Sequence, residues 1–214
     1  MTRKERYQFF ISYFSQNQPE AETELKYRNP FELLVAVVLS AQCTDKRVNI
    51  VTESLFKEFP TASAMAASNF DELFPYIRSI SYPSNKTKHL LGLSNMLVLD
   101  FGEVIPLNIE DLQRMPGVGR KTANVIVSVL DQQPAMAVDT HVFRVSKRLG
   151  LVTLKAKTPL AVERQLVKQI PDDYIHRAHH WLILHGRYTC LARKPKCQIC
   201  PLTKFCRHYA HSAV

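Results

Sequence analysis

Apolar side chains recur along this chain at the spacing of one face of a helix, and we find no convincing run of strand-like alternation. The first segment, residues 2–16, has four such residues: Tyr7, Phe10, Ile11 and Phe14. Residues 31–40 are almost wholly apolar, which over that length predicts a helix buried on most faces. Further helices are predicted at residues 44–56, 62–67, 70–78, 86–100, 158–170 and 174–188, with a break at 81–85. The predicted fold class is all-α.

Residues 112–124 predict two helices joined by a tight hairpin. Pro116 ends the first helix, and Gly117 and Gly119 permit positive φ. A Gly-Val-Gly turn before a helix exposes backbone N–H groups, which favours binding of a phosphate. In the second helix, Lys121 begins a polar stripe that continues with Asn124 and Ser128. Taken alone, the segment is more typical of a plain turn followed by a solvated lysine. Other features of the chain must decide whether it binds a phosphate.

The net charge of +9 is uneven along the 214 residues. No acidic residue follows Asp173, whereas seven basic residues do: Arg177, Arg187, Arg193, Lys194, Lys196, Lys204 and Arg207. Such a block favours a nucleic acid over an anionic membrane, although a merely solvated basic surface stays open. The chain has no apolar run that could span a bilayer, and its N-terminal segment lacks the features of a signal peptide. We therefore expect a cytoplasmic protein.

Four of the five cysteines fall within 17 residues, in a C-x6-C-x2-C-x5-C pattern: Cys190, Cys197, Cys200 and Cys206. Clustered thiols without a secretory signal are more typical of metal ligands than of disulfides. Ligand chemistry alone leaves structural zinc and a 4Fe–4S cluster both open. The fifth, Cys43, adjoins an apolar helix and is expected to be buried. The frequent late histidines are expected in capping and surface roles, since four thiolates need no histidine ligand.

Four segments together resemble the endonuclease III family, bifunctional DNA glycosylases of the helix-hairpin-helix superfamily. They are LSAQCTD at 39–45, MPGVGRKTANV at 115–125, VDTHVFRV at 138–145 and HWLILHGRYTC at 180–190. The resemblance covers nearly the whole chain in order. It implies two helical domains flanking a DNA-binding cleft: residues 22–133, and residues 1–21 together with 134–214. It also implies a 4Fe–4S cluster in the loop of residues 190–206.

The resemblance makes Lys121 the nucleophile and Asp139 the essential carboxylate. A neutral amine can attack C1′ of a damaged nucleoside, expel the base and become a Schiff base. The positive potential at a helix start favours the neutral amine. The carboxylate would stabilise the cationic sugar, and we expect it to cap the following helix as well. The Schiff base acidifies C2′, which permits β-elimination of the 3′ phosphate.

The resemblance also implies how DNA would be held. Gln42 matches the residue that fills the space left by the extruded base. A second wedge is expected at Tyr82, but residues 80–85 depart from the family's Gly-Leu-Tyr-Asn-like loop, so Tyr82 packing inward stays open. The backbone of Gly117, Val118 and Gly119 would grip a phosphate. Three basic residues of the cysteine loop would make nonspecific phosphate contacts: Arg193, Lys194 and Lys196.

The expected function is removal of oxidised pyrimidines from duplex DNA, with strand cleavage at the resulting abasic site. We expect a monomer associated with the bacterial nucleoid. A monofunctional adenine-mismatch glycosylase is the alternative within enzymes, but that relative has serine in place of Lys121 and a carboxylate in place of Ala36. A noncatalytic DNA-binding module is the other alternative, and it would require neither Lys121 nor Asp139.

Overall fold

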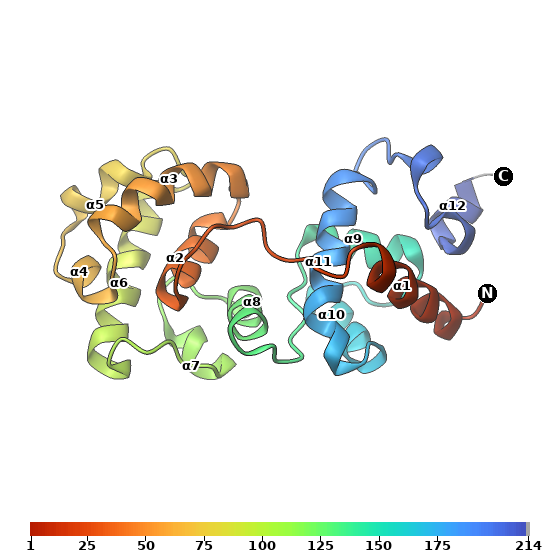
Figure 1. Cartoon of the computed structure of the whole chain (residues 1–214), viewed down its shortest axis with the longest axis horizontal. Coiled ribbons are helices and arrows are strands. Elements are labelled where there is room, and N and C mark those ends of the chain that lie inside the picture. The colour runs from red at the N-terminus through yellow and green to blue at the C-terminus, as the bar shows by residue number, and fades with distance from the viewer. Residues whose placement is uncertain (213–214) are drawn as a thin grey trace. The chain divides into compact units, whose positions relative to one another are not determined.

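The computed structural model describes residues 1–212, and this part of the chain is built from helices without a strand. It divides into two compact units (Figure 1). Unit 1 comprises residues 1–23 and 132–214, and unit 2 comprises residues 24–131. None of the helices within residues 1–212 is both long and apolar enough to cross a membrane. The all-α prediction is therefore confirmed, and the two units are described separately below.

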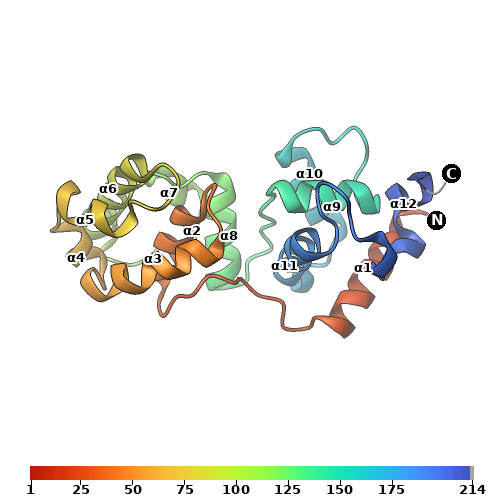
Figure 2. The same ribbon diagram turned by 90° about the horizontal axis from the view of Figure 1, so that it is seen from above.

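Unit 2 contains seven helices, one of which, α2, is almost wholly apolar (Figures 1 and 2). They are α2 (Pro30–Ser40), α3 (Asp45–Glu58), α4 (Ala62–Ala66), α5 (Phe70–Ile77), α6 (Pro83–Phe101), α7 (Ile109–Arg114) and α8 (Arg120–Asp131). α2 packs against α3, α6 and α8, and its residues 31–39 are all buried. Burial on every face is what its almost wholly apolar sequence requires.

α6 begins three residues earlier than the sequence predicts. The predicted break at residues 81–85 is wrong beyond Tyr82, because Pro83 opens the first turn of the helix. Proline suits this position, since its ring fixes φ at a helical value and its missing N–H would be unsatisfied there in any case. Of the predicted break, only residues 81 and 82 lie outside a helix, and Tyr82 has a left-handed φ of 55°.

In unit 1 a large buried aromatic residue joins the first helix to the longest one. Its helices are α1 (Arg3–Asn17), α9 (Thr140–Leu149), α10 (Pro159–Gln169), α11 (Asp172–Tyr188), α12 (Arg207–Ser212) and two short 3-10 turns, η1 (Cys197–Ile199) and η2 (Thr203–Phe205). Trp181 of α11 is fully buried against Phe10 and Phe14 of α1, and its indole N–H donates to the Gln18 carbonyl at 2.7 Å. Buried aromatic contacts of this kind fix α1 on α11. The sequence pattern did not predict α12.

Candidate active site and metal centre

The hairpin between α7 and α8 is a tight turn that needs glycine at one position. The Val118 N–H donates to the Met115 carbonyl at 3.1 Å, and Gly117 between them has a φ of +80°. A Cβ at Gly117 would lie 2.9 Å from the His89 side chain of α6. Glycine is therefore required at position 117 both for its conformation and for the close approach of α6.

Gly119 differs from Gly117, because its φ is not left-handed and the space beside it is open. A Cβ at Gly119 would meet nothing within 4 Å. Val118, by contrast, turns its side chain into the interior, where it is buried. The hairpin thus presents unobstructed backbone at Gly119, just before α8 begins.

Lys121 stands exposed in the first turn of α8. The other two members of its polar stripe, Asn124 and Ser128, are buried, each at 1% exposure. The stripe therefore leads from an exposed amine into the interior of unit 2 instead of lying along a solvated face. Only the amine at its outer end is accessible to a ligand.

Asp139 is the N-cap of α9 in unit 1. Its Oδ1 accepts the N–H groups of His141 and Val142, both at 2.8 Å, and its Oδ2 lies 3.0 Å from His141 Nδ1. The capping role expected for Asp139 is therefore present. The side chain keeps 20% of its surface exposed, so the carboxylate is fixed in orientation and still accessible. The contact with His141 was not foreseen from the sequence.

Gln42 and Tyr82 lie in two loops of unit 2 that touch. The Ser81 hydroxyl donates to the Gln42 carbonyl at 2.7 Å. Tyr82 is 61% exposed, so the alternative that its ring packs inward is wrong. Gln42 is exposed as well. The structure thus brings these two predicted residues together, with both side chains accessible. Cys43, which follows Gln42, is partly exposed, so the expectation that it is buried is wrong.

The four clustered cysteines line one small cavity between α9, the end of α11 and the C-terminal turns. Within residues 1–212 no group of three or more His, Cys, Asp or Glu side chains is arranged for a single metal ion. Burial raises the pKa of the Cys200 and Cys206 thiols, and the neighbouring cysteines raise it further. Thiolates in such a place need a cationic partner, which an iron–sulfur cluster supplies. The all-sulfur donor set therefore fits a cluster.

Two arginines of α9 hold the start of the cysteine loop. Arg144 donates to the carbonyls of Gly186 and Cys190 at 2.8 and 3.1 Å. Arg148 donates to the carbonyls of Leu191 and Ala192 at 2.6 and 2.9 Å, and its Nη1 lies 3.4 Å from Cys190 Sγ. These contacts fix the loop on α9.

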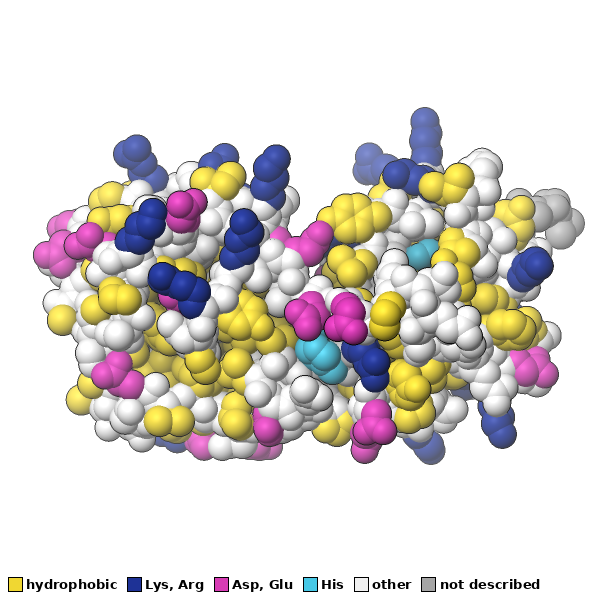
Figure 3. Space-filling model, viewed as in Figure 1, with side chains coloured by type: hydrophobic (Ala, Val, Ile, Leu, Met, Phe, Trp, Pro, Cys, Tyr) yellow, Lys and Arg dark blue, Asp and Glu magenta, His cyan; other side chains and the backbone are white. Residues whose placement is uncertain are grey.

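Three predicted basic residues of this loop are exposed: Arg193, Lys194 and Lys196. In unit 2, Lys and Arg side chains gather over α3 on the face shown in Figure 3. Each unit thus carries its own exposed basic surface.

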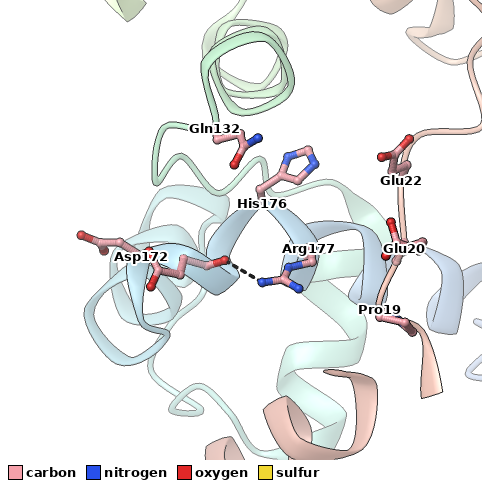
Figure 4. A pocket seen from close by; sticks show the side chains of 9 residues that line it. Pro19, Glu20, Glu22, Gln132, Asp172, His176 and Arg177 are labelled. Atoms are coloured by element: carbon pink, nitrogen blue, oxygen red, sulfur yellow. Dashed lines mark hydrogen bonds between the residues drawn. The ribbon is translucent and has the colours of Figure 1, made fainter. Parts of the chain in front are cut away.

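A polar pocket of about 350 Å³ in unit 1 contains none of the predicted site residues (Figure 4). It is lined by Pro19, Glu20, Ala21, Glu22, Gln132, Asp172, Asp173, His176 and Arg177. The ring of His176 lies 4.9 Å from that of His180, which is buried behind it. His179 and His185 are buried too, so the surface roles expected for these late histidines are wrong. Burial lowers the pKa of His180 to about 2, and His179 and His176 add to this effect.

Comparison with known proteins agrees with this geometry. The family model for HhH-GPD superfamily base excision DNA repair proteins matches residues 35–172, and that for the iron–sulfur binding domain of endonuclease III matches residues 190–206. Endonuclease III of Rickettsia felis is 47% identical over 92% of this chain and 91% of its own. That of Bacillus subtilis is 49% identical over 88% of this chain and 86% of its own. A solved structure of a trapped endonuclease III–DNA covalent intermediate, in an estranged-adenine complex, is 44% identical, covers 100% of both chains and gives a TM-score of 0.93.

The fold, the hairpin and the matched cysteine domain define a base-excision repair enzyme of the helix-hairpin-helix class. More narrowly, the chain belongs to the endonuclease III family. It is a DNA glycosylase and AP lyase, and its cofactor is a 4Fe–4S cluster held by the C-terminal cysteine domain.

Proposed function

We propose that this enzyme removes oxidised pyrimidines from duplex DNA and also acts on abasic sites, with Lys121 as nucleophile. The observation that carries the proposal is the exposed amine of Lys121 in the first turn of α8, directly after the hairpin. The relative that was solved as a covalent DNA intermediate, at 44% identity over the full chain, supports a covalent mechanism here.

In the proposed reaction the neutral Lys121 amine attacks C1′ of the damaged nucleoside. The glycosidic bond breaks, and the base leaves with its electron pair and takes up the proton that the amine loses. The C1′–O4′ bond of the sugar then breaks, O4′ takes up a proton, and the amine and C1′ become a protonated Schiff base. Loss of a proton from C2′ then expels the 3′ phosphate by β-elimination. The base leaves and the strand is cut in one catalytic cycle.

Asp139 has the role of stabilising positive charge on the sugar. Its carboxylate is oriented by two backbone N–H groups and lies beside His141, so no reorganisation is needed when charge develops. Asp139→Asn should keep the helix cap and lose most of the glycosylase rate. If the free energy of unfolding of Asp139→Asn falls enough to explain the lost activity, Asp139 has a capping role only.

DNA is held by three groups of contacts in this proposal. The open backbone at Gly119, with Gly117 and Val118 behind it, receives a phosphate. Gln42 and Tyr82 fill the space that the extruded nucleotide leaves. The exposed cations of the cysteine loop, Arg193, Lys194 and Lys196, contact phosphates without sequence preference.

We further propose that residues 22–133 form one folding domain, that residues 1–21 and 134–214 form the other, and that the enzyme acts as a monomer on the bacterial nucleoid. The compact units divide the chain after residues 23 and 131, close to these bounds. Size-exclusion chromatography with light scattering, with and without duplex DNA, tests the monomer.

Borohydride trapping tests the catalytic assignment. Wild-type protein and Lys121→Gln are incubated with duplex DNA that carries one oxidised pyrimidine, and adducts are separated on denaturing gels. We expect an adduct with wild type, none with Lys121→Gln, and a wild-type yield with Lys168→Gln, which replaces an exposed lysine of α10. Base release without an adduct would assign the chain to the monofunctional class. Binding without base release or adduct would make it a DNA-binding module.

A further inference from the structure

The loops that carry Gln42 and Tyr82 are joined by side chains from the segment that starts at Ser81. The Ser81 hydroxyl donates to the Gln42 carbonyl at 2.7 Å. The Lys86 ammonium donates to the carbonyls of Leu39 and Ala41, at 2.8 and 2.7 Å, directly before Gln42. The Lys86 backbone N–H also donates to the Tyr82 carbonyl at 3.1 Å. Ser81 and Lys86 therefore tie the start of α6 to the end of α2.

Both joined residues have a backbone conformation that their side chains disfavour. Gln42 has a φ of 54° and Tyr82 a φ of 55°, a region that non-glycine residues seldom occupy. Such residues persist only where the surrounding structure holds them. The Tyr82 side chain is 61% exposed and Gln42 is exposed, so packing of their own side chains does not hold them. The hydrogen bonds from Ser81 and Lys86 can hold the backbone of both residues in this conformation.

Lys86 is an unusual group to find at such a point. Only 5% of its surface is exposed, and burial lowers its pKa. A buried ammonium is tolerated where it is fully paired, and the C-terminal end of α2 offers unsatisfied carbonyls with partial negative charge. The two hydrogen bonds to these carbonyls offset the cost of burying the charge, and they also fix the backbone that leads to Gln42.

We infer that Ser81 and Lys86 are positioning residues, which hold Gln42 and Tyr82 as a preformed pair for the gap left by an extruded nucleotide. The inference rests on the proposed gap-filling role of Gln42 and Tyr82. A pair that is ordered before DNA arrives loses less conformational entropy on binding. The hydrogen bonds from Ser81 and Lys86 therefore increase the affinity for DNA with a missing base and leave the contacts to intact duplex unchanged.

Fluorescence anisotropy with two duplexes tests the inference, one with a tetrahydrofuran abasic analogue and one intact. We expect Ser81→Ala to weaken binding to the abasic duplex about fivefold, the effect of one lost hydrogen bond, and Lys86→Met to weaken it more than tenfold. Binding to intact duplex should stay within about twofold of wild type for both variants. Ser84→Ala is the matched control, an exposed serine of the same turn with no bond to the α2 loop.

A double-mutant cycle separates positioning from general stability. In the background of Gln42→Ala with Tyr82→Ala, the added Ser81→Ala change should alter abasic-site binding by less than about twofold. An undiminished fivefold effect there would overturn the inference, as would wild-type binding by Ser81→Ala when the Gln42→Ala and Tyr82→Ala pair binds weakly. If that pair binds like wild type, the gap-filling role is itself wrong. Borohydride trapping through Lys121 on single-stranded abasic DNA, which has no gap to fill, then shows whether the catalytic proposal stands alone.

Discussion

Each unit of this protein holds one loop by cations that bind backbone carbonyls at the end of a helix. In unit 2 the cation is Lys86, which binds two carbonyls at the end of α2. In unit 1 the cations are Arg144 and Arg148, which bind carbonyls of residues 186 and 190–192, where α11 ends. Helix C-terminal carbonyls lack intrahelical donors and carry partial negative charge, so both arrangements use the same attraction.

The two loops differ in how much they depend on a single buried group. Lys86 is buried and is the single cation bound to its loop, whereas Arg144 and Arg148 are partly exposed and both bind the cysteine loop. Water can replace a lost donor at a partly exposed carbonyl but not at a buried one. We therefore expect that burial, more than the number of hydrogen bonds, sets how much stability a loop loses when its cation is removed.

The units also differ in the titratable groups that they bury, and this gives the largest predicted effect. Unit 2 buries the charged Lys86, whereas unit 1 buries the neutral His180, whose pKa lies at about 2. In the unfolded chain a histidine takes up a proton near pH 6.5, while His180 in the folded chain does not. Stability must therefore fall as the pH drops below about 6.5, by roughly 3 kcal/mol at about pH 4.5.

Urea unfolding at about pH 7.5 and 4.5 measures this loss. The difference between the two pH values should be roughly 3 kcal/mol smaller in His180→Phe, which keeps a ring but cannot take up a proton. His211→Asn, on exposed α12, controls for removal of one histidine. An equal difference in wild type and His180→Phe would show that His180 does not carry this pH dependence.

Lys86→Met is expected to cost about 2 kcal/mol, because the Leu39 carbonyl loses its donor in the interior and the partly buried Ala41 bond is lost as well. Methionine has a similar length, so the loss reports the missing ammonium and not a cavity. Lys88→Met, on the exposed side of the same helix, should stay within about 0.5 kcal/mol of wild type. Equal stabilities of the two variants would remove the distinction between the buried and the exposed cation.

Elements that depend on short-range sequence could be predicted. Three such features are each determined by a few neighbouring residues: the apolar run of α2, the turn at Pro116 and the spacing of the cysteines. The sequence predicts a later start for α6 because Pro83 is compatible with a break, but proline also opens helices, as it does here. Helix α12 is only six residues long, too short for a periodic pattern.

Burial of polar residues could not be predicted, because their partners lie far away in sequence. Lys86 donates to a carbonyl 47 positions earlier, and nothing in residues 83–89 distinguishes it from the exposed Lys88. His180 was expected at the surface for the same reason. Among the candidate site residues, the resemblance predicts Lys121 and Asp139. The contact of Asp139 with His141 and the bond from Ser81 to Gln42 depend on how the backbone folds, which the sequence pattern does not predict.

A smaller loss is expected for Arg148→Met, about 1 kcal/mol, since Arg144 keeps its bonds and water reaches the Leu191 and Ala192 carbonyls. The cluster should be lost faster to an iron chelator, which is followed by absorbance in the visible range. Arg164→Met, on the exposed side of α10, controls for loss of an arginine. If Arg148→Met costs as much as Lys86→Met, burial does not set the dependence of a loop on its cation.

The smallest effect concerns backbone strain, which both held loops contain. Gln42 has a φ of 54° in the loop after α2 of unit 2, and Lys194 has a φ of 48° in the cysteine loop of unit 1. Glycine adopts this region freely but adds entropy to the unfolded chain, so each glycine substitution should stabilise the protein by only about 0.5 kcal/mol. Urea unfolding of Gln42→Gly and Lys194→Gly measures the gain, with Leu154→Gly as a control at an exposed position whose φ is not positive. If Gln42→Gly gains stability and Lys194→Gly does not, only the loop held by the buried cation stores strain, and the two loops then differ in kind as well as in degree.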